Sequence, residues 1–314
     1  MSLRTQKKQD ISNASHYMWR MDQSLYARNA FVAPTTHALR GDYENMRPDY
    51  TVDQPYDSYT EEEQERWRFL YNRQKALLPG YAARAFIDGL EALNADAAIP
   101  RIEDANRILD AATGWNLVAV PGLIPDDVFF EHLANKRFPM SWWMRREDEI
   151  DYLVEPDIFH DFFGHVPLLS NPVFADYMRQ YGEGGPKALQ YGAQKMLARL
   201  YWYIVEFGLI RTPEGLRAFG AGMLSSKSET VYSIESAQPH RVAFDLERIL
   251  HTDYMVDDFQ KTYFVIDSFE QLFEICSQDF APLYEKLKGR SLINPEELRP
   301  DDNIITRGRW GAAA

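Results

Sequence analysis

Two histidines five residues apart, His160 and His165, lie inside one of the most apolar stretches of the 314-residue chain. Asp157 and Asp161 accompany them, and Glu206 follows 41 residues after His165, again among aromatic and aliphatic side chains. Burying a charged group is costly unless a partner compensates for it. One metal ion would compensate all three positions at once. Two imidazoles and one carboxylate, with other coordination positions left open, are typical of non-haem Fe(II) oxygenases.

The spacing of the two histidines restricts how the chain can present them. On a regular α-helix, positions i and i+5 point about 140° apart, so they cannot share one face as the pair in His-Glu-x-x-His does. We expect His160 on a helix and His165 at its end, where Gly164 loosens the backbone and Pro167 prevents simple continuation. Either histidine alone is more simply a satisfied core residue, but the pair together with Glu206 favours a metal site. Asp157 and Asp161 remain rival ligands.

Composition restricts the class of protein. Hydrophobic residues make up 45% of the chain and aromatic residues 14%, enough for a full core and for pockets walled by rings. The net charge of −13 argues against nucleic acid or an anionic membrane as a partner, and no apolar run has the length of a membrane span. Cys276 is the one cysteine, so no intramolecular disulfide can form. The polar N-terminus lacks the apolar core of a secretory signal. We therefore expect a soluble, cytoplasmic protein.

The apolar periodicity predicts one mostly α-helical domain with minor β structure and the metal in a cleft. Residues 1–58 predict an N-terminal arm that is partly disordered or wraps the surface, residues 59–288 the catalytic domain, and residues 289–314 a polar C-terminal tail. The expected helices are 60–77, 82–93, 102–112, 125–135, one carrying His160, 173–181, 187–210 and 268–287, with a break at 183–186. The expected strands are 115–120, 137–146, 229–234 and 262–267.

Three segments carry a resemblance to a known family. PDIFHDFFGHVPLLS (156–170), YWYIVEFGL (201–209) and GAGMLSS (220–226) resemble the catalytic core of the pterin-dependent aromatic amino acid hydroxylases. Among these, the chain is most similar to the bacterial enzymes that act on phenylalanine, over about residues 59–287. The resemblance implies an aromatic amino acid hydroxylase-like catalytic domain. It further implies a monooxygenase that uses Fe(II), O₂ and tetrahydrobiopterin or a related tetrahydropterin to convert L-phenylalanine to L-tyrosine.

The resemblance also implies a role for individual residues. The iron ligands would be His160, His165 and Glu206, with Ser225 as the hydrogen-bonding partner of His160. The substrate would contact Arg145 through its carboxylate, and elsewhere Phe138, Pro156, Trp202, Gly222, Ser225, Tyr254 and Val256. The pterin would stack on Phe129 and contact Ile124 and Asp161.

Some of these positions are ambiguous by residue type alone. Arg146 is as suitable as Arg145 for a carboxylate, and an arbitrary pair of arginines is more often a solvated surface feature. Val256 is more typical of phenylalanine enzymes than of tyrosine enzymes. Pro139 departs from the animal pattern, in which a histidine follows the position of Phe138. Asp161 stands where animal members often carry glutamate.

Alternative functions and the expected partners follow from the same features. Hydroxylation of tryptophan or tyrosine is the alternative within the family. A zinc-dependent hydrolase is the alternative from another class, although HDFFGH lacks the glutamate base of His-Glu-x-x-His. A non-catalytic amino acid binding protein with a structural metal is the third. The resemblance implies small-molecule partners (L-phenylalanine, O₂ and reduced pterin) and a functional link to pterin-recycling enzymes. Because the chain shows no regulatory domain before the core and no heptad helix after it, we expect a monomer.

Overall fold

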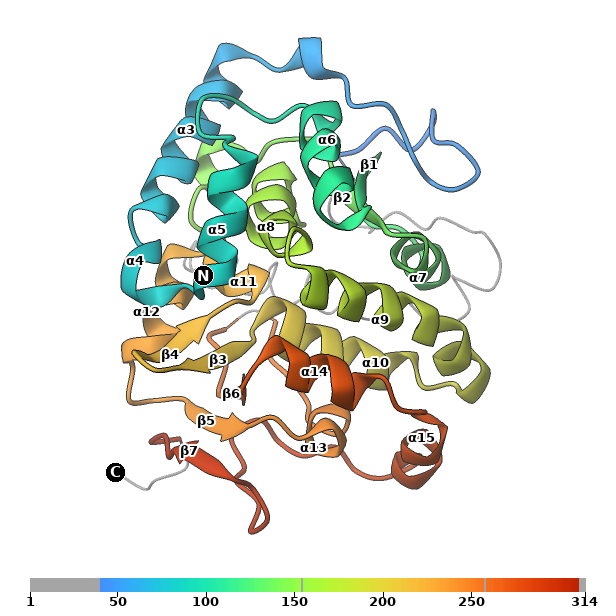
Figure 1. Cartoon of the computed structure of the whole chain (residues 1–314), viewed down its shortest axis with the longest axis vertical. Coiled ribbons are helices and arrows are strands. Elements are labelled where there is room, and N and C mark those ends of the chain that lie inside the picture. Colours follow the sequence, from blue (N-terminus) through green and yellow to red (C-terminus); the bar gives the residue numbers. More distant parts are fainter. Residues whose placement is uncertain (1–39, 154, 257, 311–314) are drawn as a thin grey trace, which may run out of the picture.

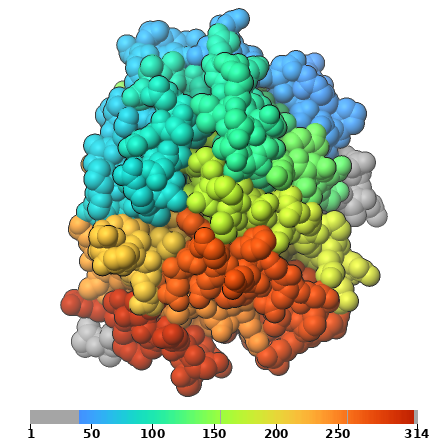
Figure 2. Space-filling model, viewed as in Figure 1, coloured from blue at the N-terminus to red at the C-terminus, as the bar shows by residue number. Residues whose placement is uncertain are grey.

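A computed structural model describes residues 40–153, 155–256 and 258–310. Helices of the N-terminal half lie at one end of the molecule, and a sheet with the last helices lies at the other (Figure 1). Figure 2 shows the same division on the surface, blue and green at one end and red at the other. The predicted class, mostly α with minor β, is confirmed. No helix in the described part of the chain combines the length and apolar character needed to cross a bilayer.

The N-terminal arm is described only in part, because residues 1–39 lie outside the described residues. Residues 40–58 run across the helical end, with a short 3₁₀ turn, η1 (Tyr56–Ser58). The backbone N–H of Val52 donates to the Ala119 carbonyl at 2.9 Å. This bond fixes the segment against the first strand, β1 (Asn116–Val120).

Local capping signals explain the first helices. The Thr60 hydroxyl accepts from the Glu63 N–H, and the Glu63 carboxylate accepts from the Thr60 N–H at 2.8 Å, so the predicted capping box opens the first helix. Gly80, at φ +89°, ends this helical region as expected. The elements here are α3 (Glu61–Lys75), the short α4 (Leu78–Tyr81), α5 (Arg84–Leu93) and α6 (Ile102–Thr113).

Two sheets organise the strands. The parallel pair β1 (Asn116–Val120) and β2 (Arg137–Ser141) flanks α7 (Asp126–Ala134), and the strand expected at 137–146 therefore ends at Ser141. The second sheet has the order β4-β3-β6-β5-β7, in which β6 runs parallel to both of its neighbours. Its strands are β3 (Leu209–Thr212), β4 (Gly215–Ala218), β5 (His240–Ala243), β6 (Thr262–Ile266) and β7 (Ile304–Thr306).

Two π-helical turns lie at the centre of the molecule, η3 (Phe159–His165) and η4 (Tyr201–Glu206). Phenylalanines of η3 pack edge-on against α3, with ring centroids 5.8 Å apart for Trp67 and Phe162 and 5.1 Å apart for Tyr71 and Phe163. The turn η3 runs directly into α8 (Val166–Leu169), and η4 directly continues α10 (Gln194–Leu200). Between α8 and α10 lies the longer helix α9 (Pro172–Tyr191).

The break predicted at 183–186 is wrong, because α9 continues through Gly184, Gly185 and Pro186. Gly185 is needed for the packing of α9 against α7. A Cβ atom at Gly185 would lie 2.2 Å from Cγ of Phe130, so only glycine allows this approach. Gly184 faces open space.

Three other element predictions are corrected. The helix expected at 187–210 is interrupted at Gly192 (φ +64°) and finishes as η4. The strand expected at 229–234 is the helix α12 (Lys227–Glu235), which Ser226 caps by accepting from the Glu229 N–H. The final helix is two helices, α14 (Phe269–Cys276) and α15 (Ala281–Leu287). The remaining short elements are η2 (Glu147–Glu149), α11 (Ala221–Leu224) and α13 (Leu246–Leu250).

Candidate active site

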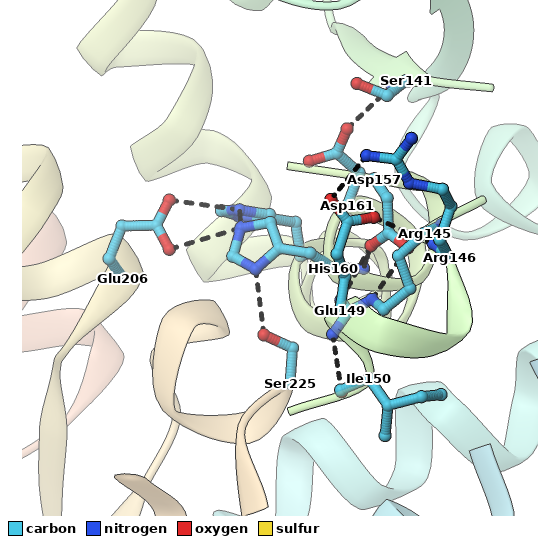
Figure 3. Close-up of polar contacts among 11 residues, drawn as sticks. Ser141, Arg145, Arg146, Glu149, Ile150, Asp157, His160, Asp161, Glu206 and Ser225 are labelled. Carbon is cyan, nitrogen blue, oxygen red and sulfur yellow. Dashed lines mark hydrogen bonds and ion pairs between the residues drawn. The ribbon is translucent and has the colours of Figure 1, made fainter. Parts of the chain in front are cut away.

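His160, His165 and Glu206 converge on one point. The Nε2 atoms of the two histidines are 3.3 Å apart, and they lie 3.6 Å and 3.3 Å from the two oxygens of Glu206. Figure 3 shows the Glu206 carboxylate facing His160 from a separate element. Within the described residues, these three form the one group of three or more histidine, cysteine or acidic side chains whose ligand atoms could hold a metal.

The π turns explain how the histidines meet. In a π-helix the backbone bonds run from i to i+5, so residue i+5 lies one turn from residue i. Both histidines therefore belong to η3, and His165 is not at a loosened helix end as expected. Gly164 has another purpose, since its Cβ would lie 2.9 Å from the Ala221 carbonyl oxygen. It allows α11 to approach η3 closely.

The donor set fits an octahedral metal ion bound on one face. With metal–donor bonds of about 2.1 Å, three such donors lie about 3 Å apart, slightly closer than the separations in this structure. Nδ1 of His160 lies 2.9 Å from Oγ of Ser225. Such a bond to the second ring nitrogen orients a ligating imidazole and leaves Nε2 for the metal.

The electrostatics suit ligands more than a general acid and base. Burial lowers the pKa of His160 to about 4, so its ring is neutral near pH 7. Burial alone would raise the pKa of Glu206, but His165 and His160 hold it below its ordinary value. Burial likewise opposes protonation of His165, but the Glu206 carboxylate outweighs it and raises the His165 pKa. A charged carboxylate and a neutral imidazole are the forms that bind metal. Glu206 and His160 therefore favour the binding form, whereas His165 would release a proton on binding metal.

The two rival acids have other partners. Asp157 is fully buried and accepts from the His160 backbone N–H at 3.0 Å. Asp161 accepts from the Ser141 backbone N–H at 2.7 Å, and burial raises its pKa to about 7. In this structure neither belongs to the group of convergent ligand atoms.

Arg145 and Arg146 differ in burial. Arg145 is buried and bonds to both oxygens of Asp157 at 2.9 Å and 2.8 Å, while it also donates to the Ile150 carbonyl at 3.2 Å (Figure 3). Burial opposes ionisation of Asp157, but the guanidinium of Arg145 holds the pKa of Asp157 below its ordinary value. The side chain of Arg146 is 70% exposed. The pair is therefore not a solvated surface pair, and Arg145 is the arginine that faces the cavity.

A cavity of about 830 Å³ lies above the three ligands. It brings together every residue to which the family resemblance gave a role except one. Tyr254 is absent from its described lining and instead stacks on Trp202, with ring centroids 4.6 Å apart. The candidate residues that line it are Ile124, Phe129, Phe138, Arg145, Pro156, His160, Asp161, His165, Trp202, Glu206, Gly222, Ser225 and Val256.

Glu229 and Gln260 are among the polar residues of the lining that the sequence did not reveal. Glu229 and Gln260 are buried, and the Gln260 backbone N–H donates to Glu229 at 3.2 Å. Burial raises the pKa of Glu229 to about 7. The prediction of a strand at 229–234 gave no reason to place Glu229 at the cavity. Ser226, three residues before Glu229, is nevertheless a helix-capping signal. Gln260 carries no motif that the sequence alone could reveal.

Comparison with known proteins places this geometry in context. Residues 5–286 match the family described as biopterin-dependent aromatic amino acid hydroxylase. The phenylalanine-4-hydroxylase of Ralstonia nicotianae is 58% identical over 277 residues, which cover 87% of this chain and 88% of that protein. The phenylalanine-4-hydroxylase of Chromobacterium violaceum is 59% identical over 261 residues, covering 83% and 88%. A crystal structure of phenylalanine hydroxylase from C. violaceum, with iron and phenylalanine bound, matches with 55% identity and a TM-score of 0.80, covering 85% of this chain and 97% of that one.

Proposed function

The chain belongs to the biopterin-dependent aromatic amino acid hydroxylases, and from this premise we propose that it hydroxylates L-phenylalanine to L-tyrosine with Fe(II), a tetrahydropterin and O₂. The family resemblance of the three segments is confirmed. Relatives 58% and 59% identical are phenylalanine-4-hydroxylases, which supports phenylalanine as the substrate. The single observation that carries the proposal is a two-histidine, one-carboxylate group at the base of a cavity walled by aromatic rings.

In this proposal His160 and His165 bind iron through Nε2, and Glu206 binds it through a carboxylate oxygen. Bound iron and reduced pterin together supply the activation of O₂ for attack on the substrate ring. Ser225 holds Nδ1 of His160 and so fixes the tautomer that leaves Nε2 available. Because all three donors lie on one side, the opposite side remains open to small molecules in the cavity.

Arg145 is the proposed partner of the substrate carboxylate. An arginine side chain has five N–H groups, and three of them bond to Asp157 and to the Ile150 carbonyl. The remaining two can meet a carboxylate in a fixed geometry, because Asp157 prevents the guanidinium from turning away. We propose that Asp157 acts through Arg145 as a positioning residue.

The substrate ring and the pterin have separate proposed walls. For the ring we propose Phe138, Pro156, Trp202 and Val256, with Gly222 and Ser225 beside the metal, all of which line the cavity. Tyr254 would act from behind Trp202. For the pterin we propose stacking on Phe129 and contacts with Ile124 and Asp161.

Metal analysis with anaerobic reconstitution tests the proposal against its alternatives. The protein is loaded separately with Fe(II) and Zn(II), then given a synthetic tetrahydropterin, O₂ and phenylalanine, tryptophan or tyrosine. We expect iron-dependent tyrosine formation from phenylalanine, with less product from the other two amino acids. Preference for tryptophan or tyrosine would reassign the substrate, and zinc-dependent ester or amide cleavage would indicate a hydrolase. Binding of amino acids without turnover on any metal would indicate a binding protein.

We also propose the organisational features expected from the sequence. Residues 59–288 would form the catalytic unit, acting as a cytoplasmic monomer whose oxidised pterin is recycled by other enzymes. The single cysteine, Cys276, is compatible with a reducing compartment. Light scattering coupled to gel filtration tests the monomer, and a mass near 36.5 kDa is the expected result.

A further inference from the structure

We propose that Gln260 is a positioning residue that fixes the plane of Trp202 and the turn carrying Val256, and thereby sets the width of the slot for the substrate ring. The inference rests on the proposed function. It concerns a buried residue of the cavity lining to which sequence analysis assigned no role.

The side-chain amide of Gln260 joins two parts of the wall. Gln260 is 2% exposed, and its Oε1 accepts from the Trp202 indole N–H at 2.9 Å. Its Nε2 donates to the Met255 carbonyl at 2.7 Å. Met255 directly precedes Val256, so one amide ties the Trp202 ring to the backbone beside the other wall residue.

The backbone of Gln260 is held as well. Its N–H donates to Oε1 of Glu229 on α12, and the Tyr263 hydroxyl on β6 donates to the same oxygen. Glu229 and Tyr263 are both buried. The amide therefore has a fixed base from which to orient Trp202, independent of the metal ligands.

Ring contacts alone would leave the indole able to slide within its own plane. Trp202 contacts Tyr254 and Phe207, with ring centroids 4.6 Å and 4.8 Å away and interplanar angles of 21° and 42°. Such contacts resist displacement along the ring normal but tolerate sliding within the plane. The hydrogen bond at the indole nitrogen opposes that sliding, so its loss should loosen the slot.

The first test replaces the amide by a side chain of similar length without hydrogen-bonding groups. Gln260→Met loses the bond to the Trp202 indole and the bonds to the Met255 and Asp258 carbonyls at 2.7 Å and 3.5 Å. The Trp202 bond acts on the slot directly and contributes about 1 kcal/mol, so we expect KM for phenylalanine to rise about fivefold. We expect kcat to change less than KM, and the preference for phenylalanine over tryptophan to decrease. The matched control is Gln54→Met, which removes an amide bonded to Pro100 and Ile102 outside the cavity lining. The control should leave KM unchanged, and an equal rise in both variants would overturn the proposal.

The second test asks whether Gln260 acts through Trp202. Trp202→Phe keeps a ring but removes the N–H donor, so in this background Gln260→Met loses only the bonds to the Met255 and Asp258 carbonyls and should raise KM by less than about twofold. If the KM increase of the double variant equals the product of the increases in Trp202→Phe and Gln260→Met, then Gln260 does not position Trp202.

A spectroscopic test keeps this inference distinguishable from the proposed function. The chain has seven tryptophans, and the ¹H–¹⁵N indole signal lost in Trp202→Phe identifies Trp202. In Gln260→Met that signal should shift upfield and exchange faster with solvent, while Gln260→Glu, which keeps an acceptor, should retain it. An unmoved signal would overturn the proposal, whether or not the parent protein hydroxylates phenylalanine. If Gln260→Met does not fold, Gln260→Asn, whose amide is too short to reach the indole, replaces it.

Discussion

The base of the cavity and its wall are built in different ways. The metal floor (His160, His165, Glu206 and Ser225) is presented by two π-helical turns and by the end of α11. The ring wall (Trp202, Val256 and Gln260) depends on a neutral amide that connects η4 to the turn before β6. The floor therefore depends first on backbone geometry, with one side-chain bond from Ser225 to His160. The wall combines the ring contacts of Trp202 with the hydrogen bonds of the Gln260 amide.

This difference separates chemistry from selectivity. Substitution of His160, His165 or Glu206 removes a donor from the metal, and we expect the remaining groups not to compensate for it. Substitution in the wall, or of Ser225, leaves all three donors in place and should be graded in its effect. Variants of the three metal ligands should therefore lose hydroxylation almost completely. Variants of the ring wall should retain it, with graded changes in KM.

The largest expected effect is in the floor. His165→Ala removes one ligand, so we expect loss of iron retention and a fall in hydroxylation of roughly a thousandfold or more. Circular dichroism should show the helical fold largely intact, and His160→Ala should behave alike. His251→Ala, at a histidine outside the cavity lining, is the control and should keep its iron. Inactive His165→Ala protein with stoichiometric iron would contradict the assignment of His165 as a ligand.

The next largest effect concerns Arg145, which lines the cavity but belongs to neither the floor nor the ring wall. Arg145→Lys keeps the charge but cannot reproduce the two-pronged bond to Asp157. We expect KM for phenylalanine to rise by about tenfold to a hundredfold, the cost of a charge-assisted bond, and the melting temperature to fall. Steady-state kinetics and thermal unfolding measure the two. Arg146→Lys, at the exposed neighbour, should change neither, and equal behaviour of the two variants would count against a special role for Arg145.

A smaller effect is expected from Ser225, which orients the ligand His160 but does not bind the metal itself. Ser225→Ala removes the partner of Nδ1 of His160, and loss of such a partner weakens metal binding by about tenfold to a hundredfold. Titration with Fe(II) under anaerobic conditions measures the affinity. Ser228→Ala, at an exposed serine, is the control. Unchanged affinity in Ser225→Ala would show that the orientation of His160 does not depend on this bond.

The last effect is on stability rather than on catalysis, and it concerns the buried carboxyl of Glu229. Burial raises the pKa of Glu229 from 4.5 to about 7, so the folded state holds this proton more tightly than the unfolded state. Stability is therefore lost as pH rises from about 4.5 to 7, and Glu229→Gln should remove that loss, by up to about 3 kcal/mol. Urea unfolding of both proteins at pH 5 and pH 8 measures it. A difference in stability between variant and parent that does not grow with pH would contradict a buried, neutral Glu229.

The same contrast explains which features could be predicted from sequence. The floor is encoded by residue types that are costly to bury, so His160, His165 and Glu206 were recognisable before any coordinates. The π turns were not, because a spacing of five on an α-helix separates the histidines, and nothing in the local sequence predicts i to i+5 bonding. Capping signals predicted α3 correctly, whereas the apolar alternation around Val231 suggested a strand where α12 forms. The sequence around Gly185 and Pro186 predicted a break, because Phe130, against which Gly185 packs, is distant in sequence.

A crystal structure of the Fe(II)-loaded protein tests the central claim most directly. The account predicts one iron per chain, bound on one face by Nε2 of His160, Nε2 of His165 and an oxygen of Glu206, with both histidines still within π-helical turn η3. Iron bound instead by Asp157 or Asp161, or with any of the three side chains turned away, would contradict it.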